Sequence, residues 1–288
     1  MQIAFHLGAH FTDPAALLRS LRHDEAGLAR EGIALPGPSQ YLPLLMQAAG
    51  AQGRSDDLPG RLRAVIGLTG GAERVILSGE DLIGLPEDAL VAGQLYPGAG
   101  DRVRTLTTLF PGERIEFHLA IRSPATFLPS LLQRSDPERV QKLLGQVDLA
   151  ALRWSDLIAR MREAAPGAPI TIWCDEDMPL IWPEALAAVS GASGDPPVAG
   201  LIDRLAPLMT DEGARRLGSR LTDHPPPNAQ ARRVIVTDFL NQFGRSEAIE
   251  MDLDIPGWTH ATIDRLSDLY EDDIDRIAAM DGVHLISP

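Results

Sequence analysis

The sequence predicts an α/β protein in which a mainly parallel sheet of about four to five strands is flanked by helices. Two observations predict this class. Short apolar runs alternate with amphipathic helical stretches over residues 1–177, and such alternation is typical of right-handed βαβ units. After residue 177 the apolar pattern is helical only, which predicts a mostly helical C-terminal part.

The expected strands cover residues 2–7, 74–78, 115–121 and 170–173. Between them, helices are expected at residues 14–30, 58–68, 102–110, 124–134 and 149–164. The later helices are expected at residues 183–189, 198–208, 211–221, 228–243 and 259–280. Residues 233–238 are β-branched enough to form a strand instead. We expect a single domain over residues 1–288, with an α/β core at 1–177 and a dependent helical part at 178–288.

The composition is that of a globular protein without disulfides. Of the 288 residues, 44% are hydrophobic and 23% are charged, so disorder is not expected. The single cysteine, Cys174, forms no intramolecular disulfide and fits a reducing compartment. The N-terminus lacks the features of a signal peptide, and prolines and glutamines interrupt the longest uncharged stretch, residues 34–53. We therefore expect a soluble, cytoplasmic protein without a membrane partner.

The charge is negative and unevenly distributed. The net charge is −14, and residues 249–288 supply −8 of it. Such a field repels a nucleic-acid backbone, so no nucleic-acid partner is expected. Lys142 is the only lysine among the 26 basic residues, so any mechanism that needs a lysine depends on that side chain.

The residues that follow each strand are the candidates for a site, because ligands bind beyond the carboxyl ends of parallel strands. The strand–loop–helix over residues 2–30 has the outline of an anion-binding loop. In the pattern Gly-x-x-x-x-Gly-Lys-Ser/Thr, Gly8 fits, but Asp13, Pro14 and Ala15 stand at the three later positions. We expect Asp13 to cap the helix and occupy N–H groups that a phosphate needs. Pro14 removes another donor, so tight phosphate binding is not expected.

Several segments resemble the bacterial sulfotransferase family. Residues 7–12, Leu-Gly-Ala-His-Phe-Thr, are similar to that family's Gly-Ala-His-Lys-Thr-Gly-Thr-Thr start, and a Gly-Ile-x-x-Pro turn follows at residues 32–36. Residues 76–82 resemble its Ser-x-Glu-Asp segment. Residues 120–130 resemble its Arg-x-Pro…Ser motif, with Arg122 and Ser130 eight positions apart. Further similarities are Trp154, the turn at 165–167, the acidic segment 175–177, and Tyr270, Asp273, Gly282 and Val283.

The resemblance covers nearly the whole chain and implies a fold of the P-loop type. Members of that family transfer a sulfuryl group from the nucleotide PAPS to a hydroxyl or amine. The resemblance implies that Arg122 and Ser130 hold the 3′-phosphate of PAPS or of its product PAP. It also implies that Gly8, Ala9 and Thr12 belong to a donor loop, residues 8–15, around the 5′-phosphosulfate.

The donor loop departs from the family pattern at the positions that carry chemistry. His10 and Thr12 match, but Phe11 replaces the lysine and Asp13 the glycine, and the two hydroxyl residues are Pro14 and Ala15. Charge develops on the leaving oxygen during transfer, and a cation or oriented donors must stabilise it. A phenylalanine side chain has neither property.

Each candidate side chain also has a structural interpretation. Glu80 is placed like a general base for an acceptor hydroxyl, or it caps or forms a salt bridge. His10 is a second candidate base, or a packed loop histidine. Arg122 suits bidentate phosphate binding, or it pairs with an acidic loop. Ser130 is otherwise an ordinary polar helix position.

Metal and thiol chemistry are not expected. Carboxylates at strand ends suit Mg²⁺, but the side chains of three successive residues, 175–177, do not converge, and the resembling family needs no metal. Cys174 has no basic activator in the sequence, so we expect a buried, inert thiol.

Two functional hypotheses follow. The first is an active sulfotransferase with an altered loop, which uses Glu80 or His10 as base and acts on an unknown small-molecule or glycan acceptor. The second is a non-catalytic relative that keeps a residual nucleotide or anion site and serves in binding or assembly. Loss of the lysine favours the second, whereas retention of Arg122, Ser130 and Glu80 favours the first. The sequence leaves the acceptor and the oligomeric state open.

Overall fold

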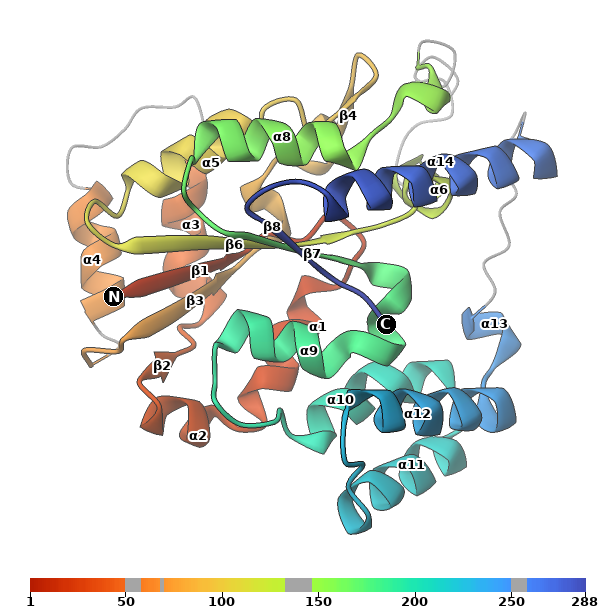
Figure 1. Cartoon of the computed structure of the whole chain (residues 1–288). Coiled ribbons are helices and arrows are strands. Elements are labelled where there is room, and N and C mark those ends of the chain that lie inside the picture. The colour runs from red at the N-terminus through yellow and green to blue at the C-terminus, as the bar shows by residue number, and fades with distance from the viewer. Residues whose placement is uncertain (50–57, 68–69, 133–146, 250–257) are drawn as a thin grey trace.

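The protein is an α/β structure in which helices cover both faces of one parallel sheet (Figure 1). The computed structural model describes residues 1–49, 58–67, 70–132, 147–249 and 258–288. In the described residues the sheet has six strands in the order β2-β3-β1-β6-β7-β8. The predicted fold class is therefore confirmed, with more strands than expected.

The strands are short and parallel to their neighbours. The expected ones are β1 (Gln2–His6), β3 (Arg74–Ser78), β6 (Arg114–Ile121) and β7 (Ile170–Cys174). The additional ones are β2 (Ile33–Ala34) and β8 (Val283–Ile286). The expectation of helices only after residue 177 is wrong at β8. Its four residues are too few for a periodic signal, and pairing with β7 decides their conformation.

One face of the sheet packs against helices from the middle and the end of the chain. They are α3 (Pro38–Ala49), α5 (Ala99–Thr108), α6 (Pro124–Leu132), α8 (Trp154–Ala164) and α14 (His260–Ala278). Helix α4 (Leu58–Gly67) contacts α3, and β4 (Leu90–Val91) pairs with β5 (Gln94–Leu95) in a small hairpin. The short 3₁₀ turns are η1 (Glu80–Leu82), η2 (Pro86–Asp88), η3 (Leu149–Ala151), η4 (Asp175–Asp177) and η5 (Ala206–Leu208).

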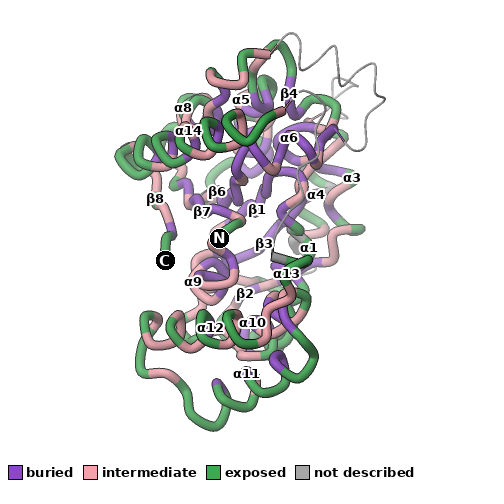
Figure 2. Tube along the Cα trace, turned by 90° about the vertical axis from the view of Figure 1, so that its right-hand side faces the viewer, coloured by how far each residue is buried: buried purple, intermediate pink, exposed green. Residues whose placement is uncertain are grey.

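The other face packs against α1 (Pro14–Arg22), α2 (Glu25–Arg30) and α9 (Met178–Ser190). Beyond them lie α10 (Val198–Leu205), α11 (Asp211–Asp223), α12 (Ala229–Phe243) and α13 (Ser246–Ile249) (Figure 1). Residues of α10, α11 and α12 share one apolar cluster with this face of the sheet. The strands are mostly buried, and the outer helices are largely exposed or intermediate (Figure 2).

The structure corrects two of the secondary-structure predictions and leaves part of a third untested. The helix expected at residues 14–30 is split into α1 and α2, because the side chain of Asp24 accepts a hydrogen bond from the Gly27 N–H and starts a second helix. The alternative strand at residues 233–238 is wrong, because these residues lie inside α12, which Asn228 caps. The last two residues of the helix expected at 124–134 lie outside the described residues.

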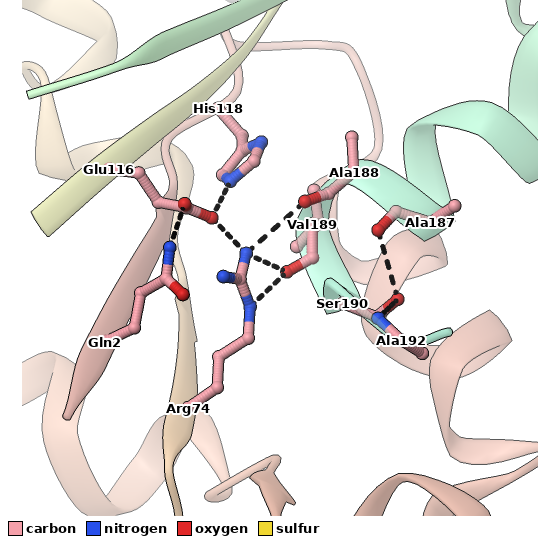
Figure 3. Close-up of polar contacts among 9 residues, drawn as sticks. All are labelled: Gln2, Arg74, Glu116, His118, Ala187, Ala188, Val189, Ser190 and Ala192. Carbon is pink, nitrogen blue, oxygen red and sulfur yellow. Dashed lines mark hydrogen bonds and ion pairs between the residues drawn. The ribbon is translucent and has the colours of Figure 1, made fainter. Parts of the chain in front are cut away.

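A buried polar network fixes α9 to the sheet (Figure 3). Arg74, at the start of β3, donates from Nε and Nη2 to the Val189 carbonyl at 3.1 and 2.8 Å. The same guanidinium pairs with Glu116, which also accepts hydrogen bonds from Gln2 and from His118 Nε2. The cation therefore satisfies the end of a helix and a buried carboxylate together.

Among the described helices, none combines the length and the apolar character that a membrane span requires.

Candidate functional site

The carboxyl ends of β1, β3, β6 and β7 bring the candidate residues to one edge of the sheet, here called the carboxyl edge. After β1 the chain forms β2 and β3 on one side of that strand and then crosses to β6 on its other side, and such a switch point is where parallel sheets place ligands. The donor loop, η1, the start of α6 and η4 follow these strands.

The donor loop is closed by its own hydrogen bonds. The Ala9 N–H donates to the Ala120 carbonyl at 2.9 Å, and the His10 N–H donates to the Tyr96 hydroxyl at 3.0 Å. The Thr12 hydroxyl donates to the Ala9 carbonyl at 2.6 Å. Two backbone donors and one hydroxyl donor that a phosphate would use are thus engaged within the protein.

Asp13 does not cap α1, so that prediction is wrong. Its φ is 46°, in the left-handed region, and its side chain makes no capping hydrogen bond. A capping residue needs an extended backbone, so this conformation turns the carboxylate away from the helix N–H groups. Asp13 Oδ2 instead lies 3.0 Å from Arg19 Nη2 and 4.0 Å from Arg204 Nη1.

His10 is buried, and both of its ring nitrogens have partners. Nδ1 lies 2.6 Å from the Tyr96 hydroxyl, and Nε2 lies 3.2 Å from Asp81 Oδ1. The Asp81 carboxylate can only accept, so we assign the proton of this contact to Nε2. The Tyr96 hydroxyl accepts from the His10 backbone N–H and occupies the other ring nitrogen, Nδ1. In this arrangement His10 presents no lone pair to a substrate.

Glu80 and Asp81 follow β3 in η1. Glu80 is half-buried, and its charge is one cause of the raised pKa of Tyr96, after burial of the phenol. The side chain of Asp81 is 46% exposed and is the partner of His10. Sequence reasoning singled out Glu80 and missed Asp81 and Tyr96. The neighbouring Glu-Asp pair is a signal for Asp81, whereas nothing local marks Tyr96.

Arg122, Thr126 and Ser130 form a row along the start of α6. Arg122 Nε donates to the Thr126 hydroxyl at 2.9 Å, and the Ser130 hydroxyl donates to the Thr126 carbonyl at 2.9 Å. Arg122 Nη1 also donates to the Phe11 carbonyl at 3.1 Å. The structure thus places Thr126 between Arg122 and Ser130 and ties Arg122 to the donor loop. The spacing of four and eight residues signals such a row.

Two acidic residues after β7 have fixed partners. Asp175 Oδ1 lies 2.9 Å from Arg204 Nη2, a residue of α10 that the sequence gave no reason to select. Glu176 accepts hydrogen bonds from the Ser123 N–H at 2.7 Å and from the Tyr270 hydroxyl at 3.3 Å. Among the described residues there is no group of three His, Cys, Asp or Glu side chains arranged to hold a metal ion.

Phe11 and Cys174 offer no polar chemistry at this edge. The Phe11 ring lies 6.1 Å from that of Phe127 and 6.2 Å from that of His10, measured between centroids. Burial raises the pKa of the Cys174 thiol to about 12, so the thiolate is not formed near neutrality. Lys142 lies outside the described residues.

No protein-family model and no curated protein matches this chain. The proposed function therefore rests on the residues and the fold.

Proposed function

We propose that this chain is a sulfotransferase-like protein with an altered donor loop, which holds the 3′-phosphate of PAP or PAPS weakly and does not carry out ordinary sulfuryl transfer. The observation that carries this proposal is the row of Arg122, Thr126 and Ser130 beside the donor loop. The Thr126 and Ser130 hydroxyls donate to the carbonyls of Ser123 and Thr126, and rotation of these hydroxyls beside the Arg122 guanidinium would suit a phosphate group.

The residues present fit the 3′ half of the nucleotide. Arg122 carries a permanent charge, and its Nε and Nη1 contacts orient the guanidinium at the carboxyl edge. The Ser130 hydroxyl is only part-buried, and while its proton points to Thr126, its oxygen keeps acceptor capacity. Rotation of that hydroxyl would offer a donor to phosphate.

The residues present do not fit the 5′-phosphosulfate. Phe11 stands where the resembling family has a lysine, and the Ala9 and His10 N–H groups are already bonded. Asp13 adds negative charge at the start of α1, where a phosphate would otherwise be favoured. We therefore derive no transfer step at this loop.

A second candidate function is an active transferase that uses the same edge differently. Glu80 and the Asp81–His10 pair place carboxylates next to the donor loop, and a carboxylate there suits a general base for a hydroxyl acceptor. The acceptor would be a small molecule or glycan. Turnover of PAPS to PAP that depends on Glu80 would favour this function.

Calorimetric titration with PAP and with PAPS tests the proposed function. We expect both to bind more weakly than about 100 µM, and Arg122→Ala to weaken binding about tenfold or more, because a charge-assisted contact is lost. Arg104→Ala, which removes an exposed arginine of α5, is the matched control and should bind like wild type. Binding at micromolar affinity that Arg122→Ala leaves unchanged would place the site elsewhere.

We also propose that the protein acts in the cytoplasm without a nucleic-acid or membrane partner. The single cysteine and the net charge of −14 support this location and these exclusions.

A further inference from the structure

A cluster of opposite charges occupies the carboxyl edge beside the proposed nucleotide site. Arg204 lies 2.9 Å from Asp175 Oδ1 and 4.0 Å from Asp13 Oδ2. Arg19 lies 3.0 Å from the same Asp13 oxygen. These four residues, here called the edge cluster, come from the residue before α1, the last turn of α1, η4 and α10.

Asp175 is the most enclosed acid of the edge cluster. Its side chain is 16% exposed and that of Arg204 is 22% exposed, whereas Asp13 and Arg19 are about half exposed. Water and salt therefore screen the Asp175–Arg204 pair least. Arg204 also lies 5.6 Å from the ring centroid of Trp182, which holds the guanidinium from a second side.

The segments that carry Asp175 and the proposed phosphate ligand Arg122 are in contact, because Glu176, the residue after Asp175, accepts a 2.7 Å hydrogen bond from the N–H of Ser123, the residue after Arg122. The charges of Arg204 and Arg122 favour ionised Asp175, whereas those of Glu176 and Asp13 oppose it. An external anion beside Arg122 would therefore be attracted by the same two guanidinium groups, Arg122 and Arg204, that stabilise the carboxylate of Asp175. The external anion and the Asp175 carboxylate repel each other, so they compete for these positive charges.

We propose that the carboxylate of Asp175 is an internal anion that keeps this edge closed to external phosphate and sulfate groups. This inference rests on the proposed function, because Arg122 belongs to both. Protonation of Asp175, or its replacement by asparagine, removes the competing charge and opens the edge. The side chain of Asp175 thus regulates the site without touching a substrate.

The titration of Asp175 gives the closure a pH dependence. Burial raises the pKa of Asp175 to about 6, in spite of Arg204; Glu176, Arg122 and Asp13 are the other charged groups that act on it. Anion binding by the wild-type protein should therefore strengthen as the pH falls through about 6. In Asp175→Asn this pH dependence should be absent.

Thermal stabilisation by sodium sulfate at constant ionic strength tests the closure, because sulfate does not titrate in this range. At about pH 7 we expect Asp175→Asn to bind sulfate about tenfold more tightly than wild type, since one competing charge is gone. Asp101→Asn is the matched control, because Asp101 is an exposed acid paired with Arg104 on α5. It also corrects for the general stabilising effect of sulfate. Equal sulfate affinities in Asp175→Asn and Asp101→Asn would overturn the closure.

Two further arms keep the result decisive. If Asp175→Asn folds poorly by circular dichroism, Asp13→Asn replaces it, with a smaller gain expected in the same direction; no gain there overturns the closure. Titration with PAP separates the two proposals. A gain of sulfate binding without any PAP binding supports the closure and contradicts the nucleotide site. PAP binding through Arg122 without a gain of sulfate binding supports the nucleotide site and contradicts the closure.

Discussion

Phe11, Asp13 and Tyr96 share an uncommon backbone conformation, with φ values of 69°, 46° and 43°. A left-handed conformation costs a residue with a side chain about 1 kcal/mol or more, and such residues cluster at functional sites. Two of these residues lie in the donor loop, and Tyr96 is bonded to it through His10. The loop thus keeps a strained shape, which the Tyr96 and Arg122 hydrogen bonds hold in place.

At Asp13, glycine should be better tolerated than alanine. Asp13→Gly relieves the left-handed strain, whereas Asp13→Ala keeps it, and both lose the same exposed ion pair with Arg19, which contributes little. We expect Asp13→Gly to be more stable than Asp13→Ala by about 1 kcal/mol. Urea unfolding of the two variants measures this difference. Equal stabilities would mean that the loop relaxes to another conformation.

Tyr96→Phe should change the protonation pattern of the His10 ring. The substitution removes the donor to Nδ1 and the acceptor for the His10 N–H, with a loss of about 2 kcal/mol of stability. In ¹⁵N NMR spectra we expect the wild-type Nε2–H tautomer to give way to a mixture. Tyr41→Phe is the control, because Tyr41 also makes two buried hydrogen bonds, to Ser78. A His10 tautomer unchanged by Tyr96→Phe would contradict the assignment.

At the scale of elements, the attachment of α9 to the sheet depends on one cation. Arg74 joins the last carbonyls of α9 to Glu116, and its guanidinium packs against Gly191, whose φ of 65° ends the helix. A Cβ at Gly191 would lie 3.1 Å from the guanidinium carbon. Helix α9 begins directly after η4 at the carboxyl edge, and this attachment fixes its other end.

Arg74→Ala should therefore destabilise the fold strongly. The variant leaves Glu116, whose side chain is 14% exposed, without its cation, and we expect a loss of about 3 kcal/mol. The matched control Arg104→Ala breaks an exposed pair with Asp101 and should cost less than about 1 kcal/mol. Denaturant unfolding monitored by circular dichroism compares them. Similar losses in the two variants would show that the buried network contributes no more than a surface pair.

Elements were predictable from sequence where their signal is local. The apolar runs predicted β1, β3, β6 and β7, and the helix expected at residues 124–134 contains α6. The contacts made over long sequence distances were not predictable. Arg204 reaches Asp175 from α10, and Tyr96 reaches His10 from beyond a small hairpin. Asp13 misled the prediction because its residue type suits a cap while its backbone conformation does not.

At the scale of the whole molecule, buried histidines set the response to acid. Burial, with the neighbouring His118, lowers the pKa of His6 to about 3, and burial also lowers the pKa of His118. In the unfolded chain these two rings take up protons below about pH 6.5, whereas in the folded protein they do so only at lower pH, so their contribution to stability falls as the pH falls through this window. Asp175 has the opposite effect, because its pKa is raised from 3.8 to about 6 in the folded protein. Its contribution to stability rises as the pH falls between those two values.

His6→Asn should reduce the acid sensitivity of the fold. Between about pH 7.5 and pH 5 we expect wild type to lose about 2 kcal/mol more stability than His6→Asn, because His6 alone contributes that much over this range. Asparagine keeps a polar group for the Ser78 hydroxyl, which lies 2.9 Å from His6 Nδ1. Urea unfolding at the two pH values gives the difference. An identical pH dependence in both proteins would contradict a neutral, buried His6.

PAP carries one phosphate at the 3′ position and one at the 5′ position of its ribose. Binding at the retained 3′ half of the site can therefore be distinguished directly from binding at the lost 5′ half. In a ³¹P NMR titration of PAP with the protein, we expect the 3′-phosphate resonance to shift and broaden while the 5′-phosphate resonance stays near its free position. Arg122→Ala should abolish the change at the 3′-phosphate. Equal changes at both phosphates, or a change at the 5′-phosphate alone, would contradict the proposed function.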